Sequence, residues 1–365
     1  MVMGRRPEVK TAPGPVVALD TVLLAQQMAI SLARLPFRRP LHGRSTWLSN
    51  LGASTTREMV RSFMGYATSL PLAEFRSIEI LLDDLCRVVM PPIVTSFGVD
   101  HRRVEIGGVP GILYTPKDRE PVGVIIYLHG GGYIGTSPTM YAFFTARLCA
   151  ETSCAVFVAD YRLAPEFPYP AGALDAGSVL KAAIEAGVPA DRLVLAGDSG
   201  GGGLCTTMAL AAEDHDGLVR PAGVILFSPE VDLRMDEPSV TDNAELDILP
   251  WNVPTTPYLQ GTDPTNALVS AVEADLEGFP PTCVSWGGDE MFRDAIRRFA
   301  AKLDEAGVHT HAHEVPGMFH VFQILMPWAD ESQAIYGHVA TFVEAIFEGT
   351  PPLPDGVLDR IHELR

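Results

Sequence analysis

From about residue 122 onward, short apolar runs alternate with longer segments in which apolar residues recur every three or four positions. The short runs are typical of buried strands, and the longer segments have the period of helices. They predict strands at 122–128, 154–160, 192–196, 222–228, 281–286 and 309–315, and helices at 171–186, 201–212, 293–306 and 331–347. Such alternation predicts a mostly parallel sheet with helices on both faces.

The first 92 residues show no strong strand pattern. Apolar residues dominate from Val16 to Leu35, but Asp20, Gln26 and Gln27 interrupt them. This stretch is too polar to span a bilayer and lacks the features of a signal peptide. We expect an amphipathic helix that packs on the body of the protein, with contact to lipid as the alternative.

A second helical stripe begins at Phe75 and continues to Val89. We expect Pro91 and Pro92 to end that helix, because proline has no backbone N–H to donate. Two strand-like runs follow between Val94 and Pro116 and meet at Gly107–Gly108. They predict an antiparallel hairpin.

Residues 233–275 break the alternation, because they are rich in Pro, Asp, Thr and Asn with only short apolar pieces. So long a detour inside a domain usually forms a lid or a functional insertion. The patterns divide the chain into an N-terminal helical segment at 1–92, an α/β domain at 93–350 that carries this insertion, and a tail at 351–365.

Charge narrows the classes of partner. The chain has 27 Lys and Arg against 45 Asp and Glu, a net charge of −18. An acidic surface argues against nucleic acid, whose phosphates require basic contacts. The five cysteines are an odd and scattered set without metal-ligand spacing. We expect reduced thiols in a cytoplasmic protein that needs neither a metal nor a cofactor.

The segment Gly197-Asp-Ser199-Gly-Gly201 follows a predicted strand and opens a predicted helix. Its spacing, G-x-S-x-G, places a serine on a sharp strand-to-helix turn at the top of a sheet. The neighbouring glycines let strand and helix pass close together. Asp198 either orients this turn or lies at the surface.

A glycine run, His129-Gly-Gly-Gly132, follows the strand predicted at 122–128. Consecutive glycines after a strand leave backbone N–H groups free to point at one spot. Acyl transfer needs such donors to hold the oxyanion of its tetrahedral intermediate. Gly131 and Gly132 are the candidates, and Gly200, which follows the serine, completes the set.

With these motifs the chain resembles the hormone-sensitive-lipase family of α/β-hydrolases, in its bacterial carboxylesterase branch. Four segments carry the resemblance, over roughly Val94 to Phe347: His129–Gly132, Asp160–Glu166, Gly197–Gly201 and Met318–Phe322. Three positions depart from the family pattern. Gly200 stands where Ala is usual, Gly203 where Asn is usual, and Tyr133 where the aromatic is often Trp.

The resemblance implies an α/β-hydrolase fold in which the N-terminal segment and the insertion form a helical cap over the site. His129 would hold the glycine loop in place. Within the Asp160 motif, Arg162 is expected to pair with a carboxylate such as Asp175. His320 lies just after a strand in the order Ser, acid, His, and is the candidate base.

The acid partner of His320 has two candidates, Glu290 and Asp289. In many relatives the acid lies four residues before a second Asp, and counting back four from Asp294 gives Glu290. Counting back nine from Phe299 also gives Glu290. Starting from the preceding Gly287–Gly288 favours Asp289, which is the commoner residue type. We prefer Glu290.

These residues predict ester hydrolysis, and the resemblance implies a carboxylesterase that cleaves small esters with short to medium acyl chains. A long-chain lipase and an amidase or deacetylase are the alternatives within this fold. A ligand-binding homologue without activity is the alternative outside enzymes. A homodimer and peripheral membrane contact through the N-terminal helix are both compatible with these residues.

Overall fold

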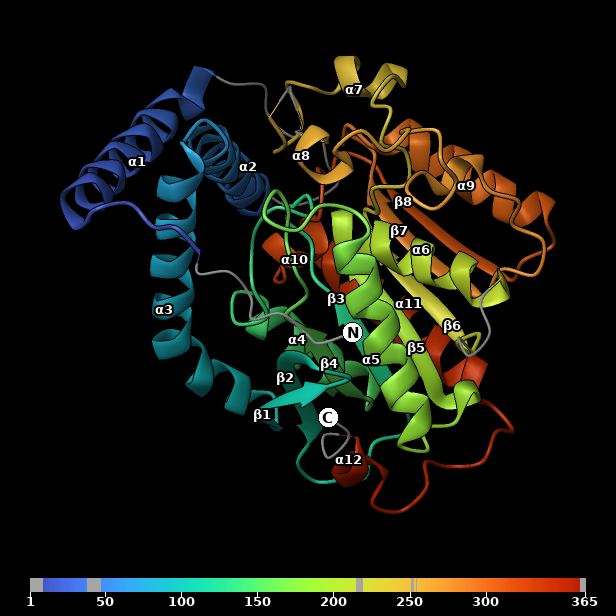
Figure 1. The fold of residues 1–365 in the computed structure, drawn as a ribbon. Helices are drawn as coiled ribbons and strands as arrows, with labels where there is room; N and C mark the ends of the chain where they lie inside the picture. The colour runs from blue at the N-terminus through green and yellow to red at the C-terminus, as the bar shows by residue number, and fades with distance from the viewer. Residues whose placement is uncertain (1–8, 38–46, 215–218, 251–252, 254, 362–365) are drawn as a thin grey trace.

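The centre of the molecule is an eight-stranded sheet in the order β1-β2-β4-β3-β5-β6-β7-β8 (Figure 1). The computed structural model describes residues 9–37, 47–214, 219–250, 253 and 255–361. β1 and β2 form the predicted antiparallel hairpin, β2 pairs antiparallel with β4, and the other pairs are parallel. The strands are Val99–Ile106 (β1), Val109–Pro116 (β2), Val124–Leu128 (β3), Ala155–Ala159 (β4), Leu193–Asp198 (β5), Gly223–Phe227 (β6), Thr282–Gly287 (β7) and Thr310–Val315 (β8).

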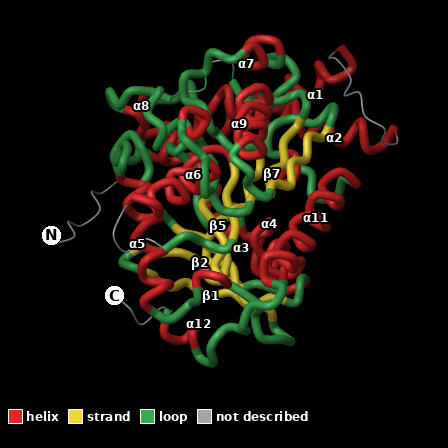
Figure 2. The backbone as a smooth tube through the Cα atoms, turned by 90° about the vertical axis from the view of Figure 1, so that its right-hand side faces the viewer, coloured by secondary structure: helices red, strands yellow, loops and turns green. Residues whose placement is uncertain are grey.

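Strands β3 to β7 are buried along their whole length, because helices cover both faces of the sheet (Figure 2). On one face α4 (Ala142–Thr152) and α11 (Asp330–Phe347) pack against the sheet and against each other. On the other lie α5 (Ala171–Glu185), α6 (Ser199–Asp214) and α9 (Arg293–Glu305). The predicted alternation of strand and helix is confirmed.

Helix α4 is the main element that the hydrophobic pattern does not predict. Seven of its positions are buried, including Phe144, Thr145 and Cys149. A helix enclosed on most sides has no polar face, so the periodic signal of an amphipathic helix is weak.

The N-terminal part forms three helices at one side of the molecule (Figure 1): α1 (Gly14–Arg34), α2 (Trp47–Ala67) and α3 (Leu72–Ser96). The expectation that Pro91 and Pro92 end a helix is wrong, since α3 continues through both. Val94 in the extra turn is buried in the core, at 1% exposure. Packing of this turn outweighs the proline penalty of about 3 kcal/mol, and the first hairpin strand consequently begins at Val99.

Helix α1 forms as predicted and packs on α2 and α3, but its apolar face is only half-buried. Its one buried residue is Asp20, which accepts a hydrogen bond from Tyr66 Oη at 3.3 Å. Leu19, Val22 and Leu23 are exposed. By length and composition α1 could cross a membrane, although a signal sequence near an N-terminus passes the same test. The expectation that this stretch is too polar to span a bilayer is therefore not supported.

Short elements complete the chain. The insertion contains α7 (Pro238–Asp242), α8 (Thr256–Leu259) and η3 (Ala271–Glu273), where η denotes a 3₁₀ helix. Part of the insertion, residues 251–252 and 254, lies outside the described residues, as do residues 362–365 of the tail. The others are η1 (Leu35–Phe37), η2 (Ala190–Arg192), α10 (Phe322–Leu325) and α12 (Val357–Arg360).

Candidate active site

Ser199 lies at the junction of β5 and α6, as the G-x-S-x-G spacing predicts. Its φ is +49°, a left-handed conformation that a non-glycine residue rarely adopts. A Cβ at Gly197 would lie 2.7 Å from the carbonyl oxygen of Leu128, and one at Gly201 would clash with the same oxygen. The tight turn therefore needs glycine on both sides of the serine.

His320 reaches Ser199 from the loop after β8. The distance between His320 Nε2 and Ser199 Oγ is 2.9 Å. The ring packs edge-on against Phe292, with 4.9 Å between centroids. The next residue, Val321, also has a positive φ of +49°, and its N–H donates to Ser228 Oγ at 3.1 Å. The imidazole is thus held by contacts on its own loop and on the neighbouring one.

Of the two candidate acids, the structure brings Glu290 to His320. Glu290 Oε2 lies 3.3 Å from His320 Nδ1, and the side chain is 0% exposed. Asn243 fixes the loop by donating to the Glu290 carbonyl oxygen at 2.9 Å. Asp289 is partly exposed, and it lies near the buried Arg57. Burial lowers the pKa of Arg57, and the charges of Glu58 and Asp289 oppose that shift.

Burial acts against the charge on both members of this pair. It raises the pKa of Glu290 and lowers the pKa of His320. The imidazole Nδ1, 3.3 Å from the carboxyl oxygen, opposes this effect for Glu290, because an N–H donor favours the ionised carboxylate. Desolvation disfavours whichever form carries the charge. A neutral imidazole at physiological pH leaves Nε2 available to accept the serine proton.

Asp247, from the insertion, is another buried carboxylate at this site, and it was not identified from the sequence. Its Oδ1 accepts from the backbone N–H of His320 at 2.9 Å, and its Oδ2 accepts from that of Met291 at 2.7 Å. One side chain therefore joins the histidine loop to the acid loop. No local motif marks it, because the contacts span 73 and 44 residues.

The glycine loop carries the geometry of an anion site. Gly131 and Gly132 have φ of +112° and +59°. Among the described residues, neither backbone N–H donates a hydrogen bond to another protein group. Gly200 opens α6, where first-turn N–H groups have no acceptor within the helix. All three lie beside the serine, and Gly131 and Gly132 line the same cavity as Ser199.

Asp198 orients the start of this loop and is buried, at 1% exposure. Its Oδ1 accepts from the N–H of Gly130 at 2.9 Å and from Tyr127 Oη at 2.7 Å, and its Oδ2 accepts from Tyr141 Oη at 2.8 Å. Burial raises the pKa of Asp198 to about 6, and these hydrogen bonds oppose the shift. Of the two readings of Asp198, the structure favours the orienting one.

His129 lies behind the loop rather than over the serine. Its Nδ1 is 2.9 Å from the carbonyl oxygen of Gly130, and its ring stacks on Tyr161 at 4.5 Å. Tyr161 Oη donates to the His129 carbonyl oxygen at 2.5 Å. The predicted pairing of Arg162 with Asp175 is present at 2.8 Å.

Tyr133 packs against both of the glycines near the serine that depart from the family pattern. A Cβ at Gly200 would lie 3.0 Å from Tyr133 N and 3.2 Å from its ring, and a Cβ at Gly203 would clash with its hydroxyl. The ring itself stacks on Tyr258 of the insertion at 3.8 Å. The tyrosine thus occupies the space that side chains at 200 and 203 would need.

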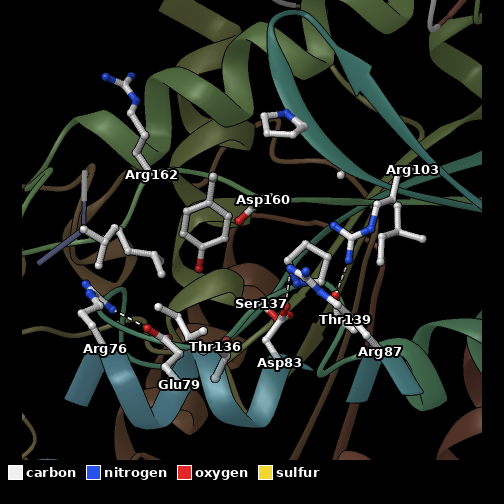
Figure 3. Close-up of a pocket in the computed structure, with 18 of the residues that line it drawn as sticks. Arg76, Glu79, Asp83, Arg87, Arg103, Thr136, Ser137, Thr139, Asp160 and Arg162 are labelled. Carbon is white, nitrogen blue, oxygen red and sulfur yellow. Dashed lines mark hydrogen bonds and ion pairs between the residues drawn. The ribbon is translucent and has the colours of Figure 1, made fainter. Parts of the chain in front are cut away.

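A cavity of about 310 Å³ opens over Ser199. Apolar side chains from α2, α3 and the insertion form its roof, and among them are Phe63, Met64, Phe75, Ile248 and Leu249. The larger cleft of the molecule, about 670 Å³, lies elsewhere, between α3, the β1–β2 hairpin and the far side of the glycine loop (Figure 3).

In the larger cleft, the charged side chains tie α3 to the body (Figure 3). Arg76 donates to the carbonyl oxygens of Ile134 at 2.6 Å and Ala164 at 2.8 Å, and it pairs with Glu79 and Glu166. Ser137 Oγ donates to Asp83 on the same helix. We interpret the charged side chains that line this cleft as structural support for the glycine loop. Among the described residues, no group of three His, Cys, Asp or Glu side chains is arranged to hold a metal.

Fold and site together define an α/β-hydrolase, and the comparisons agree. The family described as alpha/beta hydrolase fold matches residues 125–324, more than half of the chain. The chain therefore belongs to this family. Within it, the solved structures that it resembles place it among the esterases of the hormone-sensitive-lipase group. One, a hormone-sensitive lipase from a metagenome library, is 30% identical with a TM-score of 0.67, over 80% of this chain and 98% of that one.

The curated proteins that this chain resembles in sequence are esterases and an acetyl-hydrolase. An acetyl-hydrolase of Streptomyces hygroscopicus is 33% identical over 59% of this chain and 73% of its own length. An esterase of Acinetobacter venetianus is 29% identical over 80% and 95%. A carboxylesterase of Mycobacterium tuberculosis, NlhH, is 31% identical over 70% and 86%. This chain is accordingly a carboxylic ester hydrolase of the serine type.

Proposed function

We propose that this esterase cleaves carboxylic esters with short to medium acyl chains through an acyl-enzyme intermediate. The observation that carries the proposal is the row of Ser199, His320 and Glu290, with 2.9 Å and 3.3 Å between successive side chains. It lies beside three glycines whose N–H groups can serve an oxyanion. A nucleophile, a base and an orienting acid in hydrogen-bond reach are the requirements of acyl transfer.

In the proposed reaction, Ser199 Oγ attacks the ester carbonyl carbon while His320 Nε2 takes its proton. The N–H groups of Gly131, Gly132 and Gly200 hold the oxyanion. His320 then gives the proton to the leaving alcohol as the carbon–oxygen bond breaks. Water repeats the sequence on the acyl-enzyme and releases the acid. Glu290 accepts from Nδ1 and fixes the tautomer.

The size of the cavity supports the limit on acyl length. At about 310 Å³ it lies at the lower end of ligand pockets, which run from about 300 to 1,000 Å³. Its roof of side chains from α2, α3 and the insertion limits the room above Ser199. A long-chain lipase would need the roof to move.

A series of p-nitrophenyl esters from acetate to palmitate tests this proposal. We expect kcat/KM to peak at short or medium chains and to fall steeply at palmitate. A fluorophosphonate should label Ser199, and Ser199→Ala should lose nearly all activity, whereas Ser178→Ala, at a half-buried position of α5 outside the cavity lining, should not. Labelling at another serine would exclude the mechanism, and a maximum at palmitate would favour the lipase.

A further inference from the structure

One of the three carboxyl groups that line the substrate cavity has no role in the proposed reaction. Glu230 follows β6, and its backbone N–H donates to the carbonyl oxygen of Ser199 at 2.9 Å. This bond places the residue directly beside the nucleophile. The side chain is only 2% exposed, and its Oε2 has no hydrogen-bond partner.

Glu230 differs from the other acids around the cavity in having no protein partner. Asp198 accepts three hydrogen bonds through its carboxylate, and Glu79 pairs with Arg76 at 2.8 Å. Among the described residues that line the cavity, His320 is the one basic side chain. The described residues of the cavity wall therefore include three acidic side chains and no lysine or arginine that could pair with Glu230.

An unpaired buried carboxyl is costly, because it loses its hydration without gaining a partner. Burial raises the pKa of Glu230 to about 8, so in the empty cavity near neutral pH the group is mostly protonated. The cost is offset if a ligand brings the missing partner. A cation serves this purpose best, because it ionises the carboxyl and forms a charge-assisted contact in a dry site. The net charge of −18 also concentrates cations around the protein.

We propose that Glu230 binds an ammonium group of the substrate, so that the enzyme prefers esters that carry a cationic amine a few bonds from the ester carbonyl. This inference rests on the esterase function proposed above and narrows its substrate class. The amine is recognised, not transformed, and the cleaved bond is still that of the ester.

Two pairs of esters test this preference. Each pair has a cationic and a neutral member of the same shape, and the charge lies in the alcohol part of one pair and in the acyl part of the other. On the alcohol side, 2-(dimethylammonio)ethyl butyrate is compared with 3-methylbutyl butyrate. On the acyl side, the p-nitrophenyl ester of 4-(trimethylammonio)butanoate is compared with that of 5,5-dimethylhexanoate. We expect the cationic member of at least one pair to have a kcat/KM higher by about tenfold or more, the worth of a hydrogen bond or contact to a charged group.

Glu230→Gln keeps the shape and removes the charge, so it should abolish this preference, measured as the ratio of kcat/KM between the cationic and the neutral member of each pair. Glu305→Gln, on the exposed side of α9, removes one negative charge far from the cavity and should retain the preference. Equal selectivity in the parent and Glu230→Gln would overturn the inference, as would preference for the neutral member of both pairs. Failure of the proposed function is distinguishable, because the neutral esters would then not be cleaved either.

Discussion

At the scale of single residues, the choice between two adjacent carboxylates decides how the base is oriented. Glu290 is within 3.3 Å of His320 Nδ1, whereas Asp289 lies toward Arg57. We expect Glu290→Gln to lower kcat steeply, by up to about ten-thousandfold, because an amide no longer fixes the tautomer. Asp289→Asn should change kcat by less than about tenfold. Steady-state kinetics on one activated ester compare both variants, and the reverse ranking would assign the acid to Asp289.

Asp247 is the second residue whose loss should be visible in catalysis. Its carboxylate accepts from the N–H groups of His320 and Met291, and its charge raises the pKa of His320 against the effect of burial. Asp247→Asn presents an NH₂ group to one of those donors. We expect a loss of about 1–3 kcal/mol in stability and a lower kcat.

The pH profile separates this role from a merely structural one. The base must be neutral, so kcat/KM rises with pH, and burial should place the midpoint of the rise below the ordinary histidine value of 6.5. Removal of the Asp247 charge should move the midpoint to still lower pH. A variant that is less stable but has an unchanged midpoint would show that Asp247 only supports the loop.

At the scale of elements, the edge strand β8 gives the fold a sensitivity to acid. Burial, together with His338 and His311, lowers the pKa of His313 on this strand to about 4, and its ring stacks on that of His338 at 4.0 Å. The unfolded chain binds the proton at about pH 6.5, so between pH 6.5 and 4 unfolding takes up a proton. Stability should therefore fall as the pH falls through this window.

His313→Gln should reduce that loss, because glutamine does not titrate. The ring is partly exposed, so the difference should be about 1 kcal/mol or less. Urea unfolding of the parent and variant at pH 7.5 and pH 5 measures it. An identical fall in both proteins would place the acid sensitivity elsewhere.

The helices and strands also show which parts of the structure could be predicted from the sequence. The alternation of strands and helices, the serine turn and the position of His320 follow from local patterns, because each depends on a few neighbouring residues. The course of α3 through Pro91 and Pro92 depends on the burial of Val94, which a local rule does not include. No local pattern identifies Asp247 or Glu230 either, because residues from distant segments of the chain form their surroundings.

At the scale of the whole molecule, α1 leaves an apolar surface uncovered. Val22 is 63% exposed and Leu19 57%, although a surface helix usually turns such residues inward. This observation favours the lipid contact that the sequence had left as the alternative. We expect the protein to float with vesicles of phosphatidylcholine, and Leu19→Ser with Val22→Ser to weaken this flotation severalfold.

Activity on a soluble ester should be the same in this double variant, because neither residue lines the cavity. Size-exclusion chromatography of both proteins is the second measurement. If the double variant changes the oligomeric state while the parent does not float, the uncovered helix is an interface between two copies of the chain.

The attachment of α3 through Arg76 has a consequence for the order of events in a turnover. The same guanidinium that holds this part of the cavity roof also holds Ile134, two residues after Gly132. If α3 swung outward to admit an ester, the hydrogen bond from Arg76 to the Ile134 carbonyl oxygen would break. The loop that is proposed to stabilise the developing negative charge would lose this support. An open form of the enzyme would therefore be less active, and full activity would return only when α3 closes over the bound ester. Water that enters an open site would meet an imperfect oxyanion hole.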